Sequence, residues 1–416
     1  MSFAFGVTLF ALGILISVSL HEAGHMLTAK FFGMKVTRYF VGFGPTLWSF
    51  KRGETEYGIK GIPLGGFCKI VGMTPQDDDV EPGDEKRAMW RYPVWKRTIV
   101  MSAGSVTHFG LAIFATWLAA MTFGLPNPDF PRNEEQIRAE PAVIAIQDCV
   151  LPDTTWRECA AGDAPSPAAA GQLRDGDRIT SINGTPINNY GELLTTLRAT
   201  TPGSTATIGY ERDGQPGRTE TVLATTKRPP INDPSGPVTE VSALGVGLVV
   251  STPGLVSHGP VAAVGATSTF LGDMAVATAQ AMQRLPEKVP ALWRAITGGE
   301  RDIDTPISVV GASVLGGEAV ANDAWEMFVM LFISLNFFIG VFNLLPLLPL
   351  DGGHIAIAWF ERARSWVYAR LRRPDPGRVD YFKLMPFTYV VILIGGMFTL
   401  LTITADVVNP ITLFPR

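Results

Sequence analysis

Four long apolar stretches without Asp, Glu, Lys or Arg constrain this chain more than any other feature of its sequence. They occupy residues 1–20, 98–125, 327–350 and 384–405. Each is long enough to cross the hydrocarbon core of a bilayer, which takes about 20 residues of helix. Since 47% of the 416 residues are hydrophobic, we predict a polytopic α-helical membrane protein with four transmembrane helices.

The basic residues between these stretches predict the orientation in the membrane. Residues 34–97 contain eleven Lys and Arg, and residues 361–383 contain seven. Short loops rich in Lys and Arg remain in the cytoplasm, so both termini and residues 126–325 are expected outside. No basic residue precedes Lys30, so the first stretch lacks the charged start of a cleavable signal peptide and is expected to be retained.

The three cysteines fall on the two sides that this orientation defines. Cys68 is expected on the cytoplasmic side as a free thiol. Cys149 and Cys159 are expected outside, where disulfides persist. Two interpretations stay open for this pair: a disulfide bond, or two unpaired thiols in a loop.

Two segments outside the apolar stretches predict β-structure. Residues 36–71 are rich in aromatic and β-branched residues with Gly clusters between short runs, which is typical of β-hairpins. Residues 141–226 show short strands separated by turns, with one helix around Tyr190–Ala199. This segment resembles a PDZ domain of the circularly permuted bacterial type; the alternative is a generic small α/β module. The residues that carry the resemblance are Gly171, Leu173, Gly176, Asp177, Asn183 and Gly184.

The predicted fold is therefore a four-helix membrane protein with a membrane-associated β-hairpin sheet and one extracytoplasmic PDZ (α+β) domain. The expected segments are a first transmembrane helix (1–33), a cytoplasmic-side β-hairpin region and loop (34–97), a second transmembrane helix (98–125), a linker (126–140), the PDZ-like domain (141–226), an extracytoplasmic amphipathic region (227–325), a third transmembrane helix with a Pro-rich segment (326–372) and a fourth transmembrane helix (384–406).

The sequence HEAGH, at residues 21–25, carries the chemistry of the first stretch. On a helix, His21 and His25 are four residues apart and project from one face, so they can share a metal ion. Glu22 lies beside them. H-E-x-x-H is the zinc-hydrolase arrangement in which the Glu takes a proton from the water that zinc activates. Ionisable residues at the end of a membrane span are costly and are functional by default.

Two histidines do not complete a catalytic zinc site, which usually has three protein ligands. Asp351 supplies the candidate third ligand, because it ends the third apolar stretch and is the first charged residue after Glu326. The first and third helices both run inward in the predicted orientation. Asp351 should therefore lie at the same depth as the two histidines.

The segment NLLPLLPLDGGH, at residues 343–354, is expected to leave the helical conformation. Pro346 and Pro349 cannot continue a helix, so the chain before Asp351 should be irregular or extended. A peptide bond in a transmembrane helix must be held extended before it can be cleaved, and an extended segment or a strand edge can hold it. We interpret Asn343 as a clamp for the substrate backbone; the alternative is a helix cap.

Together these motifs resemble the site-2 protease family of intramembrane zinc metalloproteases, nearest to bacterial regulator-of-sigma proteases of the actinobacterial form with one PDZ domain. The resemblance covers nearly the whole chain, including GFGP at residues 42–45 and TPISVVGAS at residues 305–313. It implies zinc ligation by His21, His25 and Asp351, with Glu22 as catalytic base. It also implies that Asn343 orients substrate, and that Gly42, Gly44 and the following strands form a membrane-inserted hairpin.

One position departs from the family pattern. Relatives often read A-G-P-x-x-N in the second span, whereas this chain has Ala103-Gly104-Ser105-Val106-Thr107-His108. A fourth protein ligand would close the position that water needs, so His108 is interpreted as a hydrogen-bonding partner behind the ligands. His354 is interpreted in the same way, or as a loop residue.

The resemblance implies cleavage of transmembrane segments of single-span proteins such as anti-sigma factors, first cut by another protease, with release of a cytoplasmic fragment. The expected setting is the bacterial cell membrane, with Zn²⁺ as cofactor, peptide C-termini at the PDZ domain, and no nucleic acid. One alternative is a membrane-anchored zinc protease that acts on soluble or misfolded protein. Another is a non-enzymatic zinc transporter or scaffold, in which Glu22 would be dispensable.

Overall fold

The computed structural model describes residues 2–73, 80–81, 83–154, 157–233 and 235–414. Its internal contacts divide the chain into two compact units. The first unit consists of Met1–Leu125 and Ser257–Arg416, and the second consists of Pro126–Val256. Each unit has a hydrophobic core of its own.

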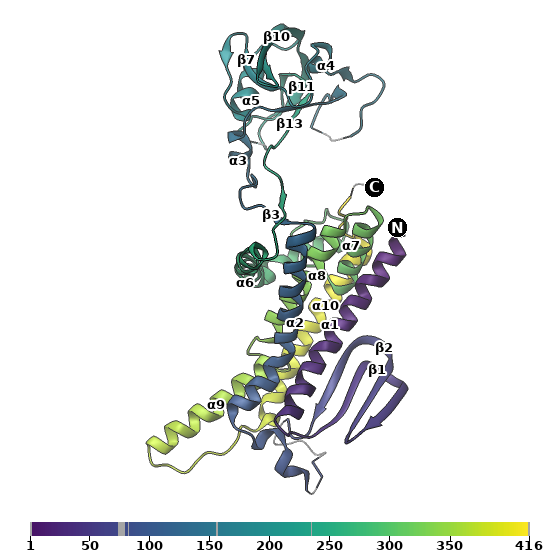
Figure 1. Ribbon diagram of the computed structural model, residues 1–416, viewed down its shortest axis with the longest axis vertical. Coiled ribbons are helices and arrows are strands. Elements are labelled where there is room, and N and C mark those ends of the chain that lie inside the picture. Colours follow the sequence, from purple (N-terminus) through teal and green to yellow (C-terminus); the bar gives the residue numbers. More distant parts are fainter. Residues whose placement is uncertain (1, 74–79, 82, 155–156, 234, 415–416) are drawn as a thin grey trace. The chain divides into compact units, whose positions relative to one another are not determined.

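The first unit is a helical bundle with a β-hairpin (Figure 1). Its helices are α1 (Phe3–Phe31), α2 (Val94–Thr122), α6 (Ala262–Ile296), α7 (Val309–Ala321), α8 (Trp325–Asn343), α9 (Asp351–Arg370) and α10 (Met385–Val408). Short 3-10 helices cover Asp84–Arg87, Met89–Arg91 and Tyr381–Leu384. Four segments are long and apolar enough to cross a membrane, which confirms the four predicted spans: Phe3–Phe31, Val94–Thr122, Trp325–Asn343 and Tyr381–Val408.

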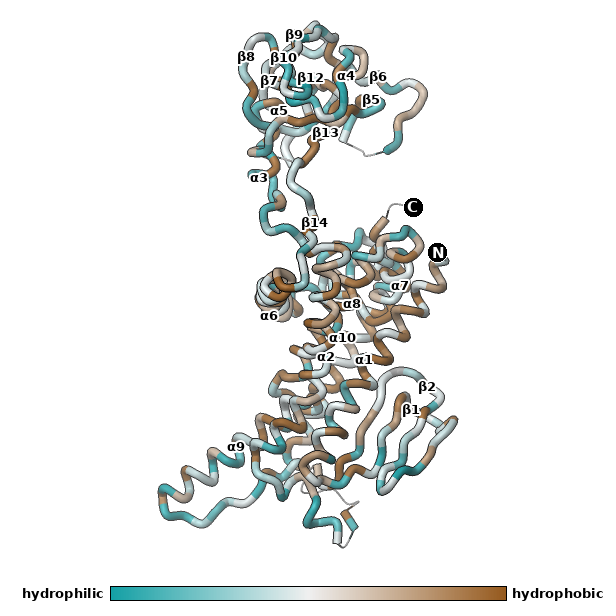
Figure 2. Tube along the Cα trace, in the orientation of Figure 1, coloured by the Kyte–Doolittle hydropathy of each residue, from teal (hydrophilic) through white to brown (hydrophobic). Residues whose placement is uncertain are grey.

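These four helices are coloured mostly as hydrophobic along their length (Figure 2). Many of their large apolar side chains are exposed, for example Leu27, Phe114 and Leu393. In water such surfaces would be unfavourable, whereas in a bilayer they face lipid. The protein is therefore a multi-pass membrane protein.

The segment predicted to contain the third span, residues 326–372, is interrupted in the structure before Asp351, where its two prolines predict a break. Helix α8 ends at Asn343, residues 344–350 form turns, and α9 begins at Asp351. Pro346 and Pro349 account for the interruption, because proline has no N–H to donate and its ring clashes with the preceding turn of a helix.

The second helix also differs from its predicted start, because it begins at Val94 and includes Lys96 and Arg97. A buried ion pair makes this possible: Arg97 Nη1 lies 3.3 Å from Glu361 Oε2 of α9. Glu361 Oε1 also accepts a hydrogen bond from the Val379 amide, at 2.9 Å. The charges at the end of α2 are thus satisfied inside the protein.

The hairpin consists of β1 (Val36–Arg52) and β2 (Thr55–Ile70), paired antiparallel. Both strands bend, so residues 36–41 pair with residues 66–70 on one side and with residues 56–59 on the other. Gly42 and Gly44 lie just after the first segment with φ of +90° and +81°. These angles are costly for residues with a Cβ, which explains why the bend requires glycine. Residues 66–70 form an outer segment of the resulting sheet.

The second unit contains the short strands and helices of residues 126–256. A four-stranded sheet has the order β10-β9-β7-β8, and further pairs include β11-β12, β13-β4 and β5-β6. The elements are β3 (Leu125–Pro126), α3 (Glu134–Ala139), β4 (Ile144–Ile146), β5 (Cys149–Val150), β6 (Ala164–Pro165), α4 (Pro167–Ala170), β7 (Arg178–Ile182), β8 (Thr185–Pro186), α5 (Tyr190–Ala199), β9 (Thr205–Arg212), β10 (Gln215–Val222), β11 (Ala224–Arg228), β12 (Thr239–Ala243), β13 (Val246–Leu248) and β14 (Leu255–Val256).

The predicted PDZ-like range, residues 141–226, is too short for this unit. Strand β12 pairs with β11, and β13 pairs with β4 at the other end of the segment. The β13–β4 pairing joins residues about 100 positions apart, so local patterns in the sequence do not reveal it. Helix α5 packs Leu193 and Leu197 into the shared core.

A buried aspartate organises the turn before β7. Asp177 is 1% exposed and accepts two hydrogen bonds from Arg212, each at 2.7 Å, and one from the Arg174 amide at 2.8 Å. Burial alone would raise the pKa of Asp177, but the guanidinium and the amide hold it below the usual range. The ionised carboxylate therefore stabilises this turn.

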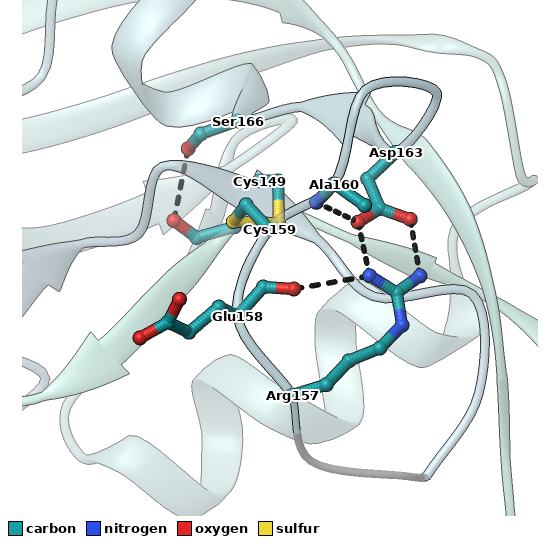
Figure 3. The surroundings of a disulfide bond; sticks show 8 residues. Cys149, Arg157, Glu158, Cys159, Ala160, Asp163 and Ser166 are labelled. Atoms are coloured by element: carbon teal, nitrogen blue, oxygen red, sulfur yellow. Dashed lines mark hydrogen bonds and ion pairs between the residues drawn. A yellow bond between two sulfur atoms is a disulfide. The ribbon is translucent and has the colours of Figure 1, made fainter.

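A disulfide joins Cys149 and Cys159 in the second unit (Figure 3). In the same loop, the Arg157 guanidinium pairs with the Asp163 carboxylate, which also accepts a hydrogen bond from the Ala160 amide. Asp163 is thereby held as an anion, and its pKa is lowered to about 2. The disulfide and the ion pair together constrain the described residues of this loop.

Candidate metal centre

Two histidines face each other on the last three turns of α1. His21 and His25 are separated by one turn, so their side chains project from the same face. Their Nε2 atoms lie 3.0 Å apart, and the rings are only 7% and 6% exposed. The local spacing in HEAGH is sufficient to produce this pair.

Asp351 completes the cluster from the first residue of α9. Its Oδ2 atom lies 3.3 Å from Nε2 of His21 and 3.3 Å from Nε2 of His25. We call these three residues the His–His–Asp cluster. The two glycines after Asp351 permit its position: a Cβ on Gly352 would overlap the carbonyl oxygens of residues 344 and 345, and one on Gly353 would lie 2.6 Å from the Leu348 nitrogen.

The dimensions of the cluster fit a tetrahedral zinc ion. Zinc lies about 2.0–2.1 Å from nitrogen or oxygen ligands, so two ligand atoms of a tetrahedral site are about 3.3 Å apart. The three separations in the cluster are 3.0, 3.3 and 3.3 Å. Apart from the two imidazoles, Asp351 Oδ2 has no hydrogen-bond partner in the described part of the chain. Three buried lone pairs that converge in this way are favourable only around a cation.

Helix α2 supports the histidines from behind. The Nδ1–H of His25 donates to the Val100 carbonyl at 2.7 Å, which directs Nε2 toward the cluster. The His21 ring lies directly against Gly104, where an added Cβ would come within 2.5 Å of Nε2 and 2.6 Å of Nδ1. Only glycine leaves room for the ring at this position.

Glu22 lies beside the cluster and next to the hairpin. Its carboxylate lies near the backbone amide of Cys68, and its Cγ is 3.3 Å from the position that a Cβ on Gly66 would take. Tyr39 fastens the same sheet to α1 by donating to the Ser19 carbonyl at 2.8 Å. The outer segment of the sheet, residues 66–70, therefore passes directly beside Glu22.

The remaining predicted site residues lie on neighbouring elements. Asn343 is the last residue of α8 and is half-buried. Its side-chain amide makes no hydrogen bond with the residues that the structure describes. Pro346 and Pro349 lie in the turns between α8 and α9, and Gly42 and Gly44 lie in the bend of β1.

His108 and His354 take different places around the cluster. His108 is 1% exposed on α2, and its ring centre is 5.2 Å from that of His21. His354 lies one turn after Asp351 on α9 and stacks on Tyr381 with ring centres 5.8 Å apart.

Sequence reasoning missed Asn336 of α8, which hydrogen-bonds to His108 at 2.9 Å and is 1% exposed. An amide inside an apolar span is itself a signal of a buried polar role. That signal is present in the sequence, but the sequence near Asn336 does not indicate that His108 is its partner.

An H-E-x-x-H helix, an aspartate from a second helix, and a bundle able to span a bilayer define the class of a membrane-embedded metallopeptidase. Comparison with known sequences agrees. The profile described as Peptidase family M50 matches residues 9–372. The chain therefore belongs to Peptidase family M50, the site-2 proteases, and it is a zinc metalloendopeptidase.

Relatives of this family align along the whole chain. Zinc metalloprotease Rip1 of Mycobacterium bovis is 43% identical over 414 residues, which is 100% of both chains. Zinc metalloprotease Rip1 of Mycolicibacterium smegmatis is 44% identical over 418 residues, again 100% of both. A putative zinc metalloprotease of Mesorhizobium japonicum is 30% identical over 385 residues, covering 89% of this chain and 90% of its own.

Proposed function

We propose that His21, His25 and Asp351 hold the zinc ion and that Glu22 is the catalytic base. The observation that carries this proposal is the convergence of three buried ligand atoms at separations of 3.0–3.3 Å. The chemistry that zinc supplies at such a site is polarisation of a carbonyl and acidification of water, to a pKa of about 7. Glu22 is the carboxylate beside the cluster, and it takes a proton from the attacking water.

The reaction is hydrolysis of a peptide bond. The water oxygen bonds to the carbonyl carbon, Glu22 accepts the water's proton, and the carbon–nitrogen bond breaks as that proton passes to the leaving nitrogen. Glu22 can fill both roles because its carboxylate lies beside the cluster and near the backbone amide of Cys68.

The substrate is a transmembrane segment held locally as a strand. The outer segment of the hairpin sheet, residues 66–70, runs beside Glu22, so a strand added to it would bring its peptide bonds to the base. The free amide of Asn343 supplies hydrogen bonds to such a substrate. Pro346 and Pro349 keep the neighbouring chain out of a helix, and Gly42 and Gly44 give the sheet its bend.

The orientation in the membrane follows from the basic loops. The cluster and the hairpin lie at the cytoplasmic side, while both termini and the second unit lie outside the bacterial cell membrane. The Cys149–Cys159 disulfide agrees with this, because disulfides persist outside the cytoplasm.

The second unit is a PDZ domain that takes up peptide C-termini. Strand β13 pairs with β4, and within the described strands its other edge is unpaired. The turn before it contains Gly245, with φ of +73°. A free strand edge after such a turn is the site where PDZ domains add a peptide strand.

The substrates are single-span proteins of the anti-sigma factor type that another protease has already shortened. Cleavage releases their cytoplasmic part. In this proposal the second unit excludes substrates whose outer domain is intact. Deletion of the second unit should therefore permit cleavage of intact substrates, and loss of all cleavage would argue against exclusion.

The proposal is tested by replacing Glu22 with Gln in the purified protein in detergent. The variant should bind zinc as the wild type does and should not cleave a single-span test substrate. Normal turnover by this variant would refute the assignment of the base.

A further inference from the structure

Asn336 and His108 form a buried hydrogen bond between two transmembrane helices. Asn336 of α8 and His108 of α2 are each 1% exposed, and Asn336 Oδ1 lies 2.9 Å from His108 Nδ1. The amide orientation is fixed by a second contact, because Asn336 Nδ2 donates to the Phe332 carbonyl at 2.9 Å. The oxygen of Asn336 therefore faces His108.

This contact determines which nitrogen of His108 carries the proton. An amide oxygen can only accept, so His108 Nδ1 must be the N–H donor. In the neutral ring the other nitrogen, Nε2, then has a free lone pair. His108 is thus an acceptor at Nε2.

The neighbouring His21 ring lacks a hydrogen-bond acceptor for its Nδ1–H. His21 directs Nε2 toward the His–His–Asp cluster, and its Nδ1 is buried without a partner in the described part of the chain. A buried N–H without a hydrogen-bond acceptor is unfavourable. A ligand histidine almost always donates its second N–H to an acceptor, as His25 does to Val100.

Helix α2 presents His108 to this face of His21. The position of a Cβ on Gly104 would be 2.4 Å from His21 Cε1, 2.5 Å from Nε2 and 2.6 Å from Nδ1, so the edge of the ring that includes Nδ1 lies against α2. His108 is four residues further along, on the same face of the helix. The two ring centres are 5.2 Å apart.

We propose that Asn336 is a positioning residue that holds His108 in the Nδ1–H tautomer, so that the ring presents an acceptor, Nε2, and not a second N–H to the Nδ1–H of His21. A series of side-chain interactions from Phe332 through Asn336 and His108 to His21 then connects α8 to the metal ligand on α1. This inference rests on the proposed role of His21 as a zinc ligand. It assigns a role to Asn336 and a specific tautomer to His108.

The first test measures the tautomer. The protein has five histidines, and ¹⁵N spectra of histidine-labelled protein in detergent distinguish the two neutral tautomers. Comparison with His108→Leu assigns the His108 signals. Wild-type His108 should show a protonated Nδ1 with or without zinc, and Asn336→Leu should lose this preference. The opposite tautomer in the wild type would overturn the proposal.

The second test measures zinc affinity by competition with a chelator. Asn336→Leu should bind zinc about 10- to 100-fold more weakly, and His108→Leu should do the same. The double variant should be no weaker than either single variant, because both act through one chain. Phe337→Leu, an apolar change at the next position of α8, is the matched control and should retain wild-type affinity.

The outcomes separate this inference from the proposed function. If His25→Ala abolishes zinc binding while Asn336→Leu changes neither the tautomer nor the affinity, the inference fails and the zinc site stands. If neither His21→Ala nor His25→Ala weakens zinc binding, the proposed ligand set fails, and the inference fails with it. Additive effects of the two leucine substitutions would also overturn the inference, since a purely structural role gives additivity.

Discussion

The close contact between Gly104 and His21 makes a sharp prediction about the metal centre. Replacing Gly104 with Ala adds a methyl group at 2.4 Å from His21 Cε1, 2.5 Å from Nε2 and 2.6 Å from Nδ1. Ordinary contacts begin at 3.4 Å, so either the ring or helix α2 must move by about 1.0 Å. The ring cannot turn away freely, because His25 Nε2 and Asp351 Oδ2 lie 3.0 and 3.3 Å from its Nε2.

The magnitude follows from the cost of such crowding. Overpacking a well-packed site costs about 1–3 kcal/mol, which corresponds to zinc binding about 5- to 150-fold weaker. A displacement of about 1 Å in a catalytic group also lowers turnover by about 10²-fold. Gly104→Ala should therefore lose both zinc affinity and cleavage.

The assay compares Gly104→Ala with Gly110→Ala on the same helix. No atom lies within 4 Å of a Cβ at position 110, so this control carries the same change in helix propensity without the crowding. Zinc affinity is measured by chelator competition, and cleavage is measured on a single-span substrate in detergent. Wild-type affinity and turnover in Gly104→Ala would refute the reasoning about this contact.

Three further predictions concern stability. Removing the disulfide with Cys149→Ser and Cys159→Ser should destabilise the second unit by about 2–3 kcal/mol, because the bond closes a loop with a sequence separation of 10. Hydrogen exchange of the strands in this unit measures the loss, and unchanged protection would contradict the prediction. Arg97→Leu should lower stability by about 3–5 kcal/mol, because Glu361 is left buried and unpaired; thermal unfolding in detergent checks it. The lowered pKa of Asp177 predicts that its carboxylate stabilises the second unit above the unfolded-state pKa of about 3.9, and that this stabilisation is lost as the pH falls through the folded-state pKa. Hydrogen exchange of the β7 amides should become faster over this pH range. Asp177→Asn should abolish this pH dependence.

Local patterns were sufficient to predict the parts of the site that lie close together in the sequence. The spacing of His21 and His25 places both on one helix face, and the prolines before Asp351 predict the break after α8. The proximity of Asp351 to the histidines was predicted from the orientation of two apolar spans. These predictions depend on helix period, length and charge, which the sequence displays directly.

The parts that were missed depend on pairing across long distances. Nothing near Asn336 indicates that its partner is His108, because the contact depends on how α2 and α8 pack. The pairing of β13 with β4 likewise closes the second unit across about 100 residues. The start of α2 before Arg97 was not predicted, since the burial of Arg97 requires Glu361 from another helix.

The most direct test of the central claim measures zinc content and cleavage together in wild type, Glu22→Gln and Asp351→Asn. The account predicts that Glu22→Gln holds zinc without cleaving a single-span substrate and that Asp351→Asn loses zinc and activity. Full zinc content and normal cleavage in Asp351→Asn would contradict it, because the third ligand would then lie outside the His–His–Asp cluster.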